Sequence, residues 1–430
     1  MKLAVVGAGW AGLAAAVAAV EAGHLVTVFE ASRHVGGRAR SLGPATDSLD
    51  NGQHILIGAY THTLDLMRRV GVDPEQVLQR QSLQLVFGDG RRFDLPPGPQ
   101  ALAFARGVWA CKSWSLAQRL ATLRWAACLA LNGFDCAAEQ TVTGLCASLP
   151  AAVRAMLIDP LCVAALNTPA QQASAQVLLR VLKDALLGGP GSADLLLPRV
   201  GLDQLLPGPA LRWLQRQGAT VLLGAPVQHL HATAHGCEVN GQAFEGAVLA
   251  CPAAQAARLA AGLNDGWSQT AAALPFEPII TVVLHCPGAR LPAAMTALLV
   301  DDDSPAQFVF DHGALGWAPG RFAFVVSGAA AWVERGLQAT EAAVLKQALR
   351  DFPAGTWPSA PTVVKTVAEK RATFRCVPAL RRPALQVHPR VAAAGDHVAG
   401  PYPATLEGAV RSGEQAIHHL LASIRLQPKA

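Results

Sequence analysis

The chain opens on a glycine-rich turn between two segments of different pattern, and this turn constrains the fold most. Gly7, Gly9 and Gly12 follow an apolar stretch at residues 2–6 that predicts a buried strand, and an alanine-rich stretch at residues 11–22 that predicts a helix comes next. Free backbone N–H groups and the helix dipole favour a phosphate at such a turn. We therefore predict the first unit of a doubly wound α/β sheet that binds a dinucleotide.

Each residue of this first unit has a predicted task. Gly7 permits the tight turn, Gly9 leaves room for a pyrophosphate, and Gly12 lets the helix pack closely on the strand. A second strand at residues 25–30 ends on Glu30, where an acid can accept a hydrogen bond from a free ribose 2′-hydroxyl and disfavours a 2′-phosphate. Three neighbours complete the predicted dinucleotide contacts: Trp10, Ala11 and Ala31.

A second glycine element predicts that the dinucleotide is FAD. Gly36 and Gly37 precede Arg38, which combines another close backbone approach with a bidentate partner for phosphate. A Rossmann enzyme that binds only NAD has no need of this element, whereas it is typical of FAD proteins.

A strand–loop–helix near the C-terminus supplies a third element. Asp396, which follows Gly395, can accept hydrogen bonds from ribitol hydroxyls. Thr405 and Leu406 open a helix whose positive N-terminal end can stabilise the charge of a reduced flavin, and Ala409 lies one turn further along. Together the three elements predict one cofactor site assembled from both ends of the chain.

Composition narrows the function of the 430-residue chain. Hydrophobic residues make up 51% and charged residues 15%, which allows a large apolar interior. The net charge of +5 is dispersed, which argues against a nucleic-acid partner. The nine cysteines lack metal-ligand spacing, so we expect no metal site and a reducing, cytoplasmic compartment. Residues 3–20 imitate a signal peptide, but their glycines fit a nucleotide loop better.

The middle of the chain predicts an inserted unit. Residues 101–189 indicate helices broken at Pro150, Pro160 and Pro169, and residues 202–217 indicate one further helix. Residues 83–95 indicate a hairpin, and residues 239–250 indicate a hairpin and a strand. Single strands are expected at residues 220–223, 227–230, 279–285, 307–310, 322–326, 362–367 and 391–394. The remaining helices are expected at residues 340–352 and 406–421.

This order predicts an α/β fold with a Rossmann-type FAD-binding domain and an inserted, discontinuous α+β substrate domain. The FAD-binding domain is expected to comprise residues 1–82, 196–265 and 386–430. The substrate-binding domain is expected to comprise residues 83–195 and 266–385.

The glycine elements together resemble the FAD-dependent amine oxidase/phytoene desaturase superfamily. Residues 199–202 stand where that superfamily has a Gly-Gly-Leu/Met turn, with Val200 replacing the first glycine. The resemblance implies that the backbone at Val227 contacts adenine. Amine oxidases of the superfamily often carry a lysine on the strand that corresponds to residues 279–285, and this chain has none there and no cysteine at the covalent flavin anchor. We therefore expect noncovalent FAD and no amine oxidation.

A narrower resemblance comes from two local motifs. Residues 50–60, Asp-Asn-Gly-Gln-His-Ile-Leu-Ile-Gly-Ala-Tyr, and residues 369–374, Glu-Lys-Arg-Ala-Thr-Phe, resemble the hydroxysqualene dehydroxylases of squalene and hopanoid synthesis. That family implies a reductive reaction in which hydroxysqualene loses an allylic hydroxyl and the allylic cation takes a hydride from flavin N5. On this basis Gly52, Gln53 and His54 are expected beside the flavin.

Such a reaction needs an acid for the leaving hydroxyl and an apolar tunnel that excludes water. The candidate acids are His54, Asp50, Tyr60 and Glu369. His54 is preferred because an unperturbed imidazole has a pKa of about 6.5. A structural hydrogen bond beside the flavin explains His54 equally well.

The expected partners are hydroxysqualene, an unidentified electron donor and neighbouring enzymes of the pathway. Residues 106–131 combine Trp109, Trp114 and Trp125 with basic residues, which indicates either a helix resting on the inner face of a membrane or the core of the substrate domain. Two other functions stay open. One is an oxidative, carotenoid-type desaturase, and the other is a non-catalytic flavin-binding partner of a lipid enzyme.

Overall fold

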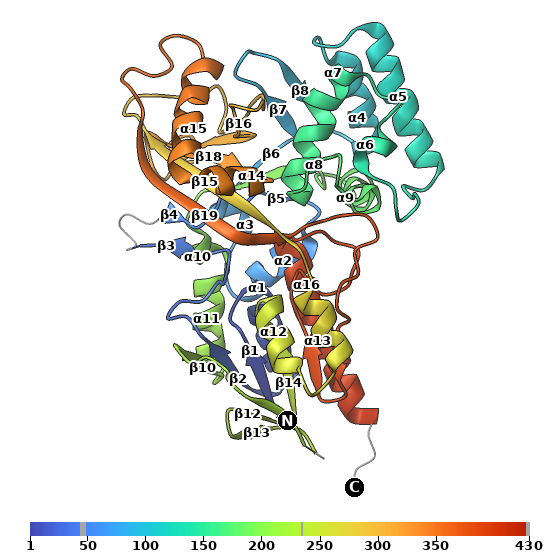
Figure 1. Ribbon diagram of the computed structural model, residues 1–430, viewed down its shortest axis with the longest axis vertical. Helices are drawn as coiled ribbons and strands as arrows, with labels where there is room; N and C mark the ends of the chain where they lie inside the picture. The colour runs from blue at the N-terminus through green and yellow to red at the C-terminus, as the bar shows by residue number, and fades with distance from the viewer. Residues whose placement is uncertain (44–48, 234, 427–430) are drawn as a thin grey trace.

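The computed structural model describes residues 1–43, 49–233 and 235–426, and two β-sheets dominate it (Figure 1). A six-stranded sheet lies at the end that carries both termini. A five-stranded sheet lies at the other end, beside a group of helices. This arrangement of a parallel α/β unit and a second α+β unit confirms the predicted fold class.

The six-stranded sheet joins segments that lie far apart in the sequence. Its order is β10, β2, β1, β14, β21 and β20, and its neighbours are parallel except for β20 and β21. The strands are β1 (Lys2–Val6), β2 (Leu25–Glu30), β10 (Thr220–Leu223), β14 (Gly246–Leu249), β20 (Gln386–His388) and β21 (Val391–Ala393). Strands of a parallel sheet are buried on both faces and are therefore continuously apolar. For this reason β1 and β2 could be predicted from the sequence.

Helices cover both faces of this sheet. Leu3 and Val5 of β1 pack into one core with α1 and α16, whereas Ala4 and Val6 pack into another with α12 and α13. The helices are α1 (Trp10–Glu21), α11 (Pro207–Arg216), α12 (Ala253–Ala260), α13 (Asp265–Ala272) and α16 (Leu406–Leu426). The alternation follows from the two-residue period of a strand. A Cβ at Gly413 of α16 would lie 2.2 Å from the Ala11 carbonyl oxygen, so α16 packs closely on the start of α1.

The five-stranded sheet is antiparallel in the order β16, β17, β18, β15 and β19. Its strands are β15 (Phe276–His285), β16 (Met295–Ala297), β17 (Phe308–Asp311), β18 (Arg321–Val326) and β19 (Thr362–Phe374). One face packs on α14 (Ala330–Arg335) and α15 (Leu337–Asp351), and the other face packs on the helical group. Strand β19 is longer than predicted and reaches the loop after β2, where the Ala372 carbonyl accepts a hydrogen bond from Arg38.

The helical group confirms the helices expected between residues 101 and 189. It comprises α4 (Gln100–Ala110), α5 (Leu116–Leu131), α6 (Val142–Leu145), α7 (Ala151–Val153), a π-helix (Arg154–Ile158), α8 (Asp159–Leu166) and α9 (Ala175–Leu187). The break predicted at Pro160 is wrong. The π turn widens the helix just before Pro160, so that the proline, which has no N–H, sits in the first turn of α8 without interrupting it.

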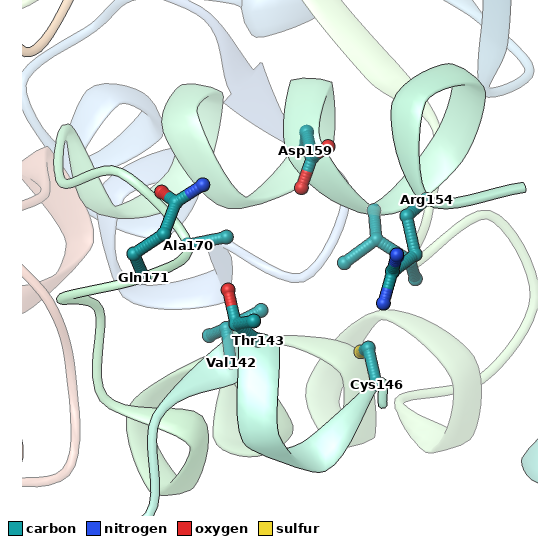
Figure 2. A pocket seen from close by; sticks show the side chains of 8 residues that line it. Val142, Thr143, Cys146, Arg154, Asp159, Ala170 and Gln171 are labelled. Atoms are coloured by element: carbon teal, nitrogen blue, oxygen red, sulfur yellow. The ribbon is translucent and has the colours of Figure 1, made fainter. Parts of the chain in front are cut away.

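The π turn also forms the wall of a small cavity of about 180 Å³. Figure 2 shows Arg154 and Asp159, at the two ends of the turn, beside this space, with Thr143, Cys146 and Gln171 around it. Burial raises the pKa of Asp159, and the Arg154 charge acts in the opposite direction.

The remaining elements are short helices and strands. They are β3 (Ser41–Leu42), β4 (Leu49–Asp50), β5 (Leu56–Ile57), α2 (Thr61–Arg69), α3 (Pro74–Val77), β6 (Leu78–Gln81), β7 (Gln84–Val86), β8 (Arg92–Asp94), β9 (Leu195–Pro198), α10 (Leu202–Leu205), β11 (Leu230–Ala232), β12 (Cys237–Val239) and β13 (Gln242–Phe244). Two predictions are wrong here. The helix expected at residues 202–217 divides at Leu206, and the strand expected at residues 227–230 begins only at Leu230. Among the described helices, none has the length and hydropathy to cross a membrane.

Candidate functional site

A cavity of about 690 Å³ lies between the carboxyl ends of the parallel strands and the five-stranded sheet. Its two ends differ in chemistry. The glycine end is formed by the turns at Gly7, Gly9, Gly36 and Gly37 and the loop at Gly395. The apolar end is lined by side chains of α8 and the five-stranded sheet: Val163, Ala164, Ala165, Ile279, Phe308, Phe310 and Val325.

Most of the predicted site residues line this one cavity. Those at the cavity wall are Gly7, Gly9, Trp10, Ala11, Glu30, Ala31, Gly36, Gly37, Arg38, Gly52, Gln53, His54, Tyr60, Val227, Glu369, Gly395, Asp396, Thr405, Leu406 and Ala409. Two predicted residues, Gly12 and Asp50, lie outside the wall.

The first glycine turn leaves no room for a side chain at Gly7 or Gly12. At Gly7, where φ is +108°, a Cβ atom would lie 2.5 Å from the Ala250 carbonyl oxygen. At Gly12 a Cβ would lie 1.9 Å from the Gly7 carbonyl oxygen, so Gly12 serves the packing of the turn on its helix. At Gly9 the nearest atom to a Cβ is Gly37 Cα, 3.9 Å away, and Gly9 lines the cavity. The turn is therefore a backbone cradle open on the cavity side.

The second glycine turn packs directly on the first. The Gly36 N–H donates to the Ala8 carbonyl at 2.8 Å. Gly36 and Gly37 both have positive φ, and a Cβ at Gly37 would lie 3.2 Å from Gly9 Cα. Because a Cβ at Gly37 would press on Gly9, the two turns meet as one continuous main-chain surface.

Glu30 is fixed to the first turn by main-chain donors. Its Oε2 accepts from the Ala8 N–H at 2.7 Å and its Oε1 accepts from the Ser32 N–H at 2.8 Å. A carboxylate has about four lone-pair sites, so both oxygens can still accept from a ligand hydroxyl.

Arg38 has a different environment from the one expected of a free phosphate ligand. Its guanidinium donates to the Asp396 carboxylate and, at 2.7 Å, to the Ala372 carbonyl. Burial alone would raise the pKa of Asp396, but Arg38 and His397 outweigh it and hold that pKa well below its usual range. The ion pair joins the second glycine turn to the loop after β21, so each of the two predicted ligands orients the other.

The start of α16 is held by a buried carboxylate. Glu407 is fully buried and accepts from the Thr63 N–H at 2.9 Å and the Thr63 hydroxyl at 2.7 Å. Thr405 caps the first turn, since its hydroxyl accepts from the Gly408 N–H at 3.1 Å. These contacts hold Leu406 and Ala409 against the cavity.

Val227 lies in a loop at the glycine end. Its carbonyl accepts from Arg258 at 3.0 Å and from Gln255 at 3.2 Å. Both partners belong to α12 and line the cavity, although sequence reasoning did not select them. Residues 250–252, Ala-Cys-Pro, lead directly into α12 and line the same wall.

His54 and Gln53 lie on the loop that leads to β5. The His54 Nδ1 is 3.0 Å from the Gly52 carbonyl, and burial, together with the Arg38 charge, lowers the pKa of His54. A neutral ring that donates from Nδ1 keeps a lone pair on Nε2. Gln53 Oε1 lies 3.1 Å from Nε2 of His312, a residue that sequence reasoning missed. His312 stacks on Trp317 at 4.2 Å, and burial lowers its pKa to about 3.

The other three candidate acids differ in position. Tyr60 and Glu369 line the cavity, and burial raises the pKa of Tyr60 above its ordinary value. Asp50 instead accepts from the Ser41 hydroxyl at 2.7 Å and the Leu202 N–H at 3.0 Å, and burial raises its pKa to about 6. Asp50 therefore ties the connecting loops together.

Comparison with known proteins shows the family to which the chain belongs. The chain belongs to the family of flavin-containing amine oxidoreductases, whose model matches residues 10–418. Within that class it is similar to hydroxysqualene dehydroxylases, among them that of Sinorhizobium fredii, which is 28% identical and 96% covered in each chain. This similarity confirms the narrower resemblance predicted from residues 50–60 and 369–374.

Two further comparisons differ in how much of the chain they cover. A zeta-carotene desaturase of Synechocystis is 36% identical, but only over 92 residues, or 21% of this chain and 19% of its own length. The crystal structure of an oxidoreductase from Methanosarcina mazei superposes with a TM-score of 0.75 at 14% identity, covering 97% of this chain and 100% of the other. The chain is thus a flavin-dependent oxidoreductase with the fold of this class.

Proposed function

We propose that the protein binds FAD noncovalently and converts hydroxysqualene to squalene by reductive dehydroxylation. The observation that carries this is one cavity with two different ends: a main-chain cradle with a fixed acid, and an apolar chamber whose lining suits an isoprenoid chain. The full-length similarity to hydroxysqualene dehydroxylases supports the same substrate.

The residues present fit a flavin dinucleotide. Gly7, Gly9 and Gly37 leave the backbone bare for a pyrophosphate, Glu30 can accept from the ribose, and the Val227 loop would hold the adenine. The N-terminal end of α16 would face the flavin ring. When bound and reduced, FAD supplies the hydride.

The chain itself must handle one proton. The allylic hydroxyl leaves as water after it takes a proton, and the carbon that it leaves takes the hydride. We place His54 at this step, with Glu369 and Tyr60 as the other acids at the wall. Because burial lowers the pKa of His54, turnover should rise as the pH falls toward that pKa, and His54→Gln should remove the slope. A His54→Ala enzyme with bound FAD and full turnover would exclude this role.

The deciding experiment is anaerobic. The purified protein is chemically reduced and mixed with hydroxysqualene while the flavin spectrum and the squalene formed are followed together. Reoxidation in step with squalene formation supports the proposal. Bleaching of the oxidised protein by phytoene instead would indicate the oxidative desaturase. The physiological electron donor is a separate question, because the chemical reductant replaces it here.

A further inference from the structure

The outer helices of the helical group carry an unusual surface. Of the fourteen large hydrophobic side chains that are exposed among the described residues, five lie on α4 and α5: Leu102, Trp109, Leu116, Leu120 and Leu131. Trp109 is 53% exposed, whereas Trp114 and Trp125 are 2% and 8% exposed and belong to the core. Trp114 and Trp125 thus confirm the core interpretation for part of the segment, and the membrane interpretation of the exposed part stays a prediction.

These side chains gather on one face of each helix. At 100° per residue, Leu116, Leu120 and Leu131 fall within about 60° of arc on α5, and Arg124 lies beside them. On α4, Leu102 and Trp109 lie seven positions apart with Arg106 between them, again on one side. The two helices contact each other at the rim of the molecule (Figure 1). We call this surface the α4–α5 face.

The charge of the segment has a single sign. Residues 95–134 contain Arg106, Lys112, Arg119 and Arg124 and no Asp or Glu. A second copy of the chain docked face to face would place four cations against four cations, which disfavours a symmetric dimer. An apolar stripe flanked by cations alone suits a surface with an apolar interior and anionic headgroups.

We propose that the α4–α5 face docks on an anionic lipid bilayer, with both helices lying in the plane of the interface. The same helical group lines the apolar end of the cavity through Val163, Ala164 and Ala165 of α8, and its core includes Phe308 and Phe310. Docking would hold the unit that forms the apolar end against the membrane. This proposal goes beyond the proposed reaction, and vesicle binding can be measured without substrate.

The test is flotation of the full-length protein with vesicles of phosphatidylcholine alone or of phosphatidylcholine and phosphatidylglycerol in equal parts. We expect flotation with the anionic vesicles that weakens as salt is added. Leu116→Ser/Leu120→Ser should lower partitioning at least about 10-fold, and each cation replaced by Gln should lower it about fivefold. Leu349→Ser on α15, where the side chain is 58% exposed, is the matched control and should float like the wild type.

A second readout uses Trp109 directly. The fluorescence difference between wild type and Trp109→Phe should shift to the blue only with anionic vesicles. Equal flotation of wild type and the double Leu variant would overturn the proposal. So would a dimer in sedimentation that the double variant dissolves. If the protein converts detergent-dispersed hydroxysqualene but does not float with vesicles, only the docking proposal is refuted. If it floats with vesicles but does not convert hydroxysqualene, only the proposed reaction is refuted.

Discussion

The glycine end and the apolar end of the cavity are built in different ways. At the glycine end, main-chain atoms set the shape, and a Cβ at Gly7 or Gly12 would overlap a carbonyl oxygen. At the apolar end, side chains from α8, β15, β17 and β18 set the shape. The first end has no space for a side chain at Gly7 or Gly12. The second can change volume residue by residue, so that substrate choice can vary while the cofactor stays the same.

Gly7→Ala tests whether main-chain atoms set the shape of the glycine end, and it should have the largest effect. The residue has φ of +108° and its new Cβ would lie 2.5 Å from the Ala250 carbonyl oxygen, so the turn must open. We expect flavin occupancy, measured as the ratio of flavin to protein absorbance, to fall on the order of 10-fold or more, which corresponds to about 1.4 kcal/mol of binding. Gly23→Ala, at the other end of α1, is the control: φ is +77° but no atom lies within 4 Å, so flavin should stay bound.

Asp396→Asn tests the ion pair that joins the two loops of the glycine end. Loss of the charge leaves Arg38 without its carboxylate, and we expect a cost of about 2 kcal/mol, below the usual range for fully buried pairs because Arg38 is 35% exposed. Since the pKa of Asp396 is lowered in the folded state, its contribution is complete above about pH 4 and declines as the pH falls below that value. Urea unfolding of both proteins from pH 7 to pH 3 should show a constant gap down to about pH 4, which then narrows without closing by pH 3 because the folded pKa lies lower still. A gap of unchanged size at pH 3 would mean that the pair is not its source.

Ala164→Phe tests the apolar end. The side chain lines the cavity from α8 and is exposed, so a larger residue occupies cavity volume without disturbing the core. We expect kcat/KM for hydroxysqualene to fall about 10-fold while the flavin spectrum stays unchanged. Ala152→Phe on α7, which is also exposed but outside the cavity wall, should leave both unchanged. Loss of flavin from Ala164→Phe would show that the two ends are not independent.

The same contrast explains what the sequence could predict. Gly7, Glu30 and Arg38 stand in short motifs whose spacing has a local physical reason, so their place at one cavity could be predicted. The pairing of Arg38 with Asp396 spans 358 positions and depends on how β21 inserts into the sheet, which no local pattern encodes.

The residues of the apolar end could not be predicted from the sequence, for a related reason. Phe308, Phe310 and Val325 look like any strand residues, and only the order of β17, β18 and β15 directs them toward α8. The bonds of His312 to Gln53 and of Arg258 to Val227 likewise join distant segments. The domain limits set from the sequence stay predictions.

The smallest expected effect separates structure from catalysis at Asp50. Burial raises its folded pKa to about 6, so the ionised carboxylate costs stability above the unfolded pKa of about 4, and this cost grows until about pH 6. Asp50→Asn keeps an oxygen that accepts from Ser41 and Leu202 but carries no charge. We expect it to equal the wild type in stability at pH 4 and to exceed it by about 1 kcal/mol at pH 8 in urea unfolding, with flavin content and turnover unchanged. A variant that is stable and flavin-loaded but inactive would instead return Asp50 to the reacting atoms, and would require the loop that carries it to close over the cavity during turnover.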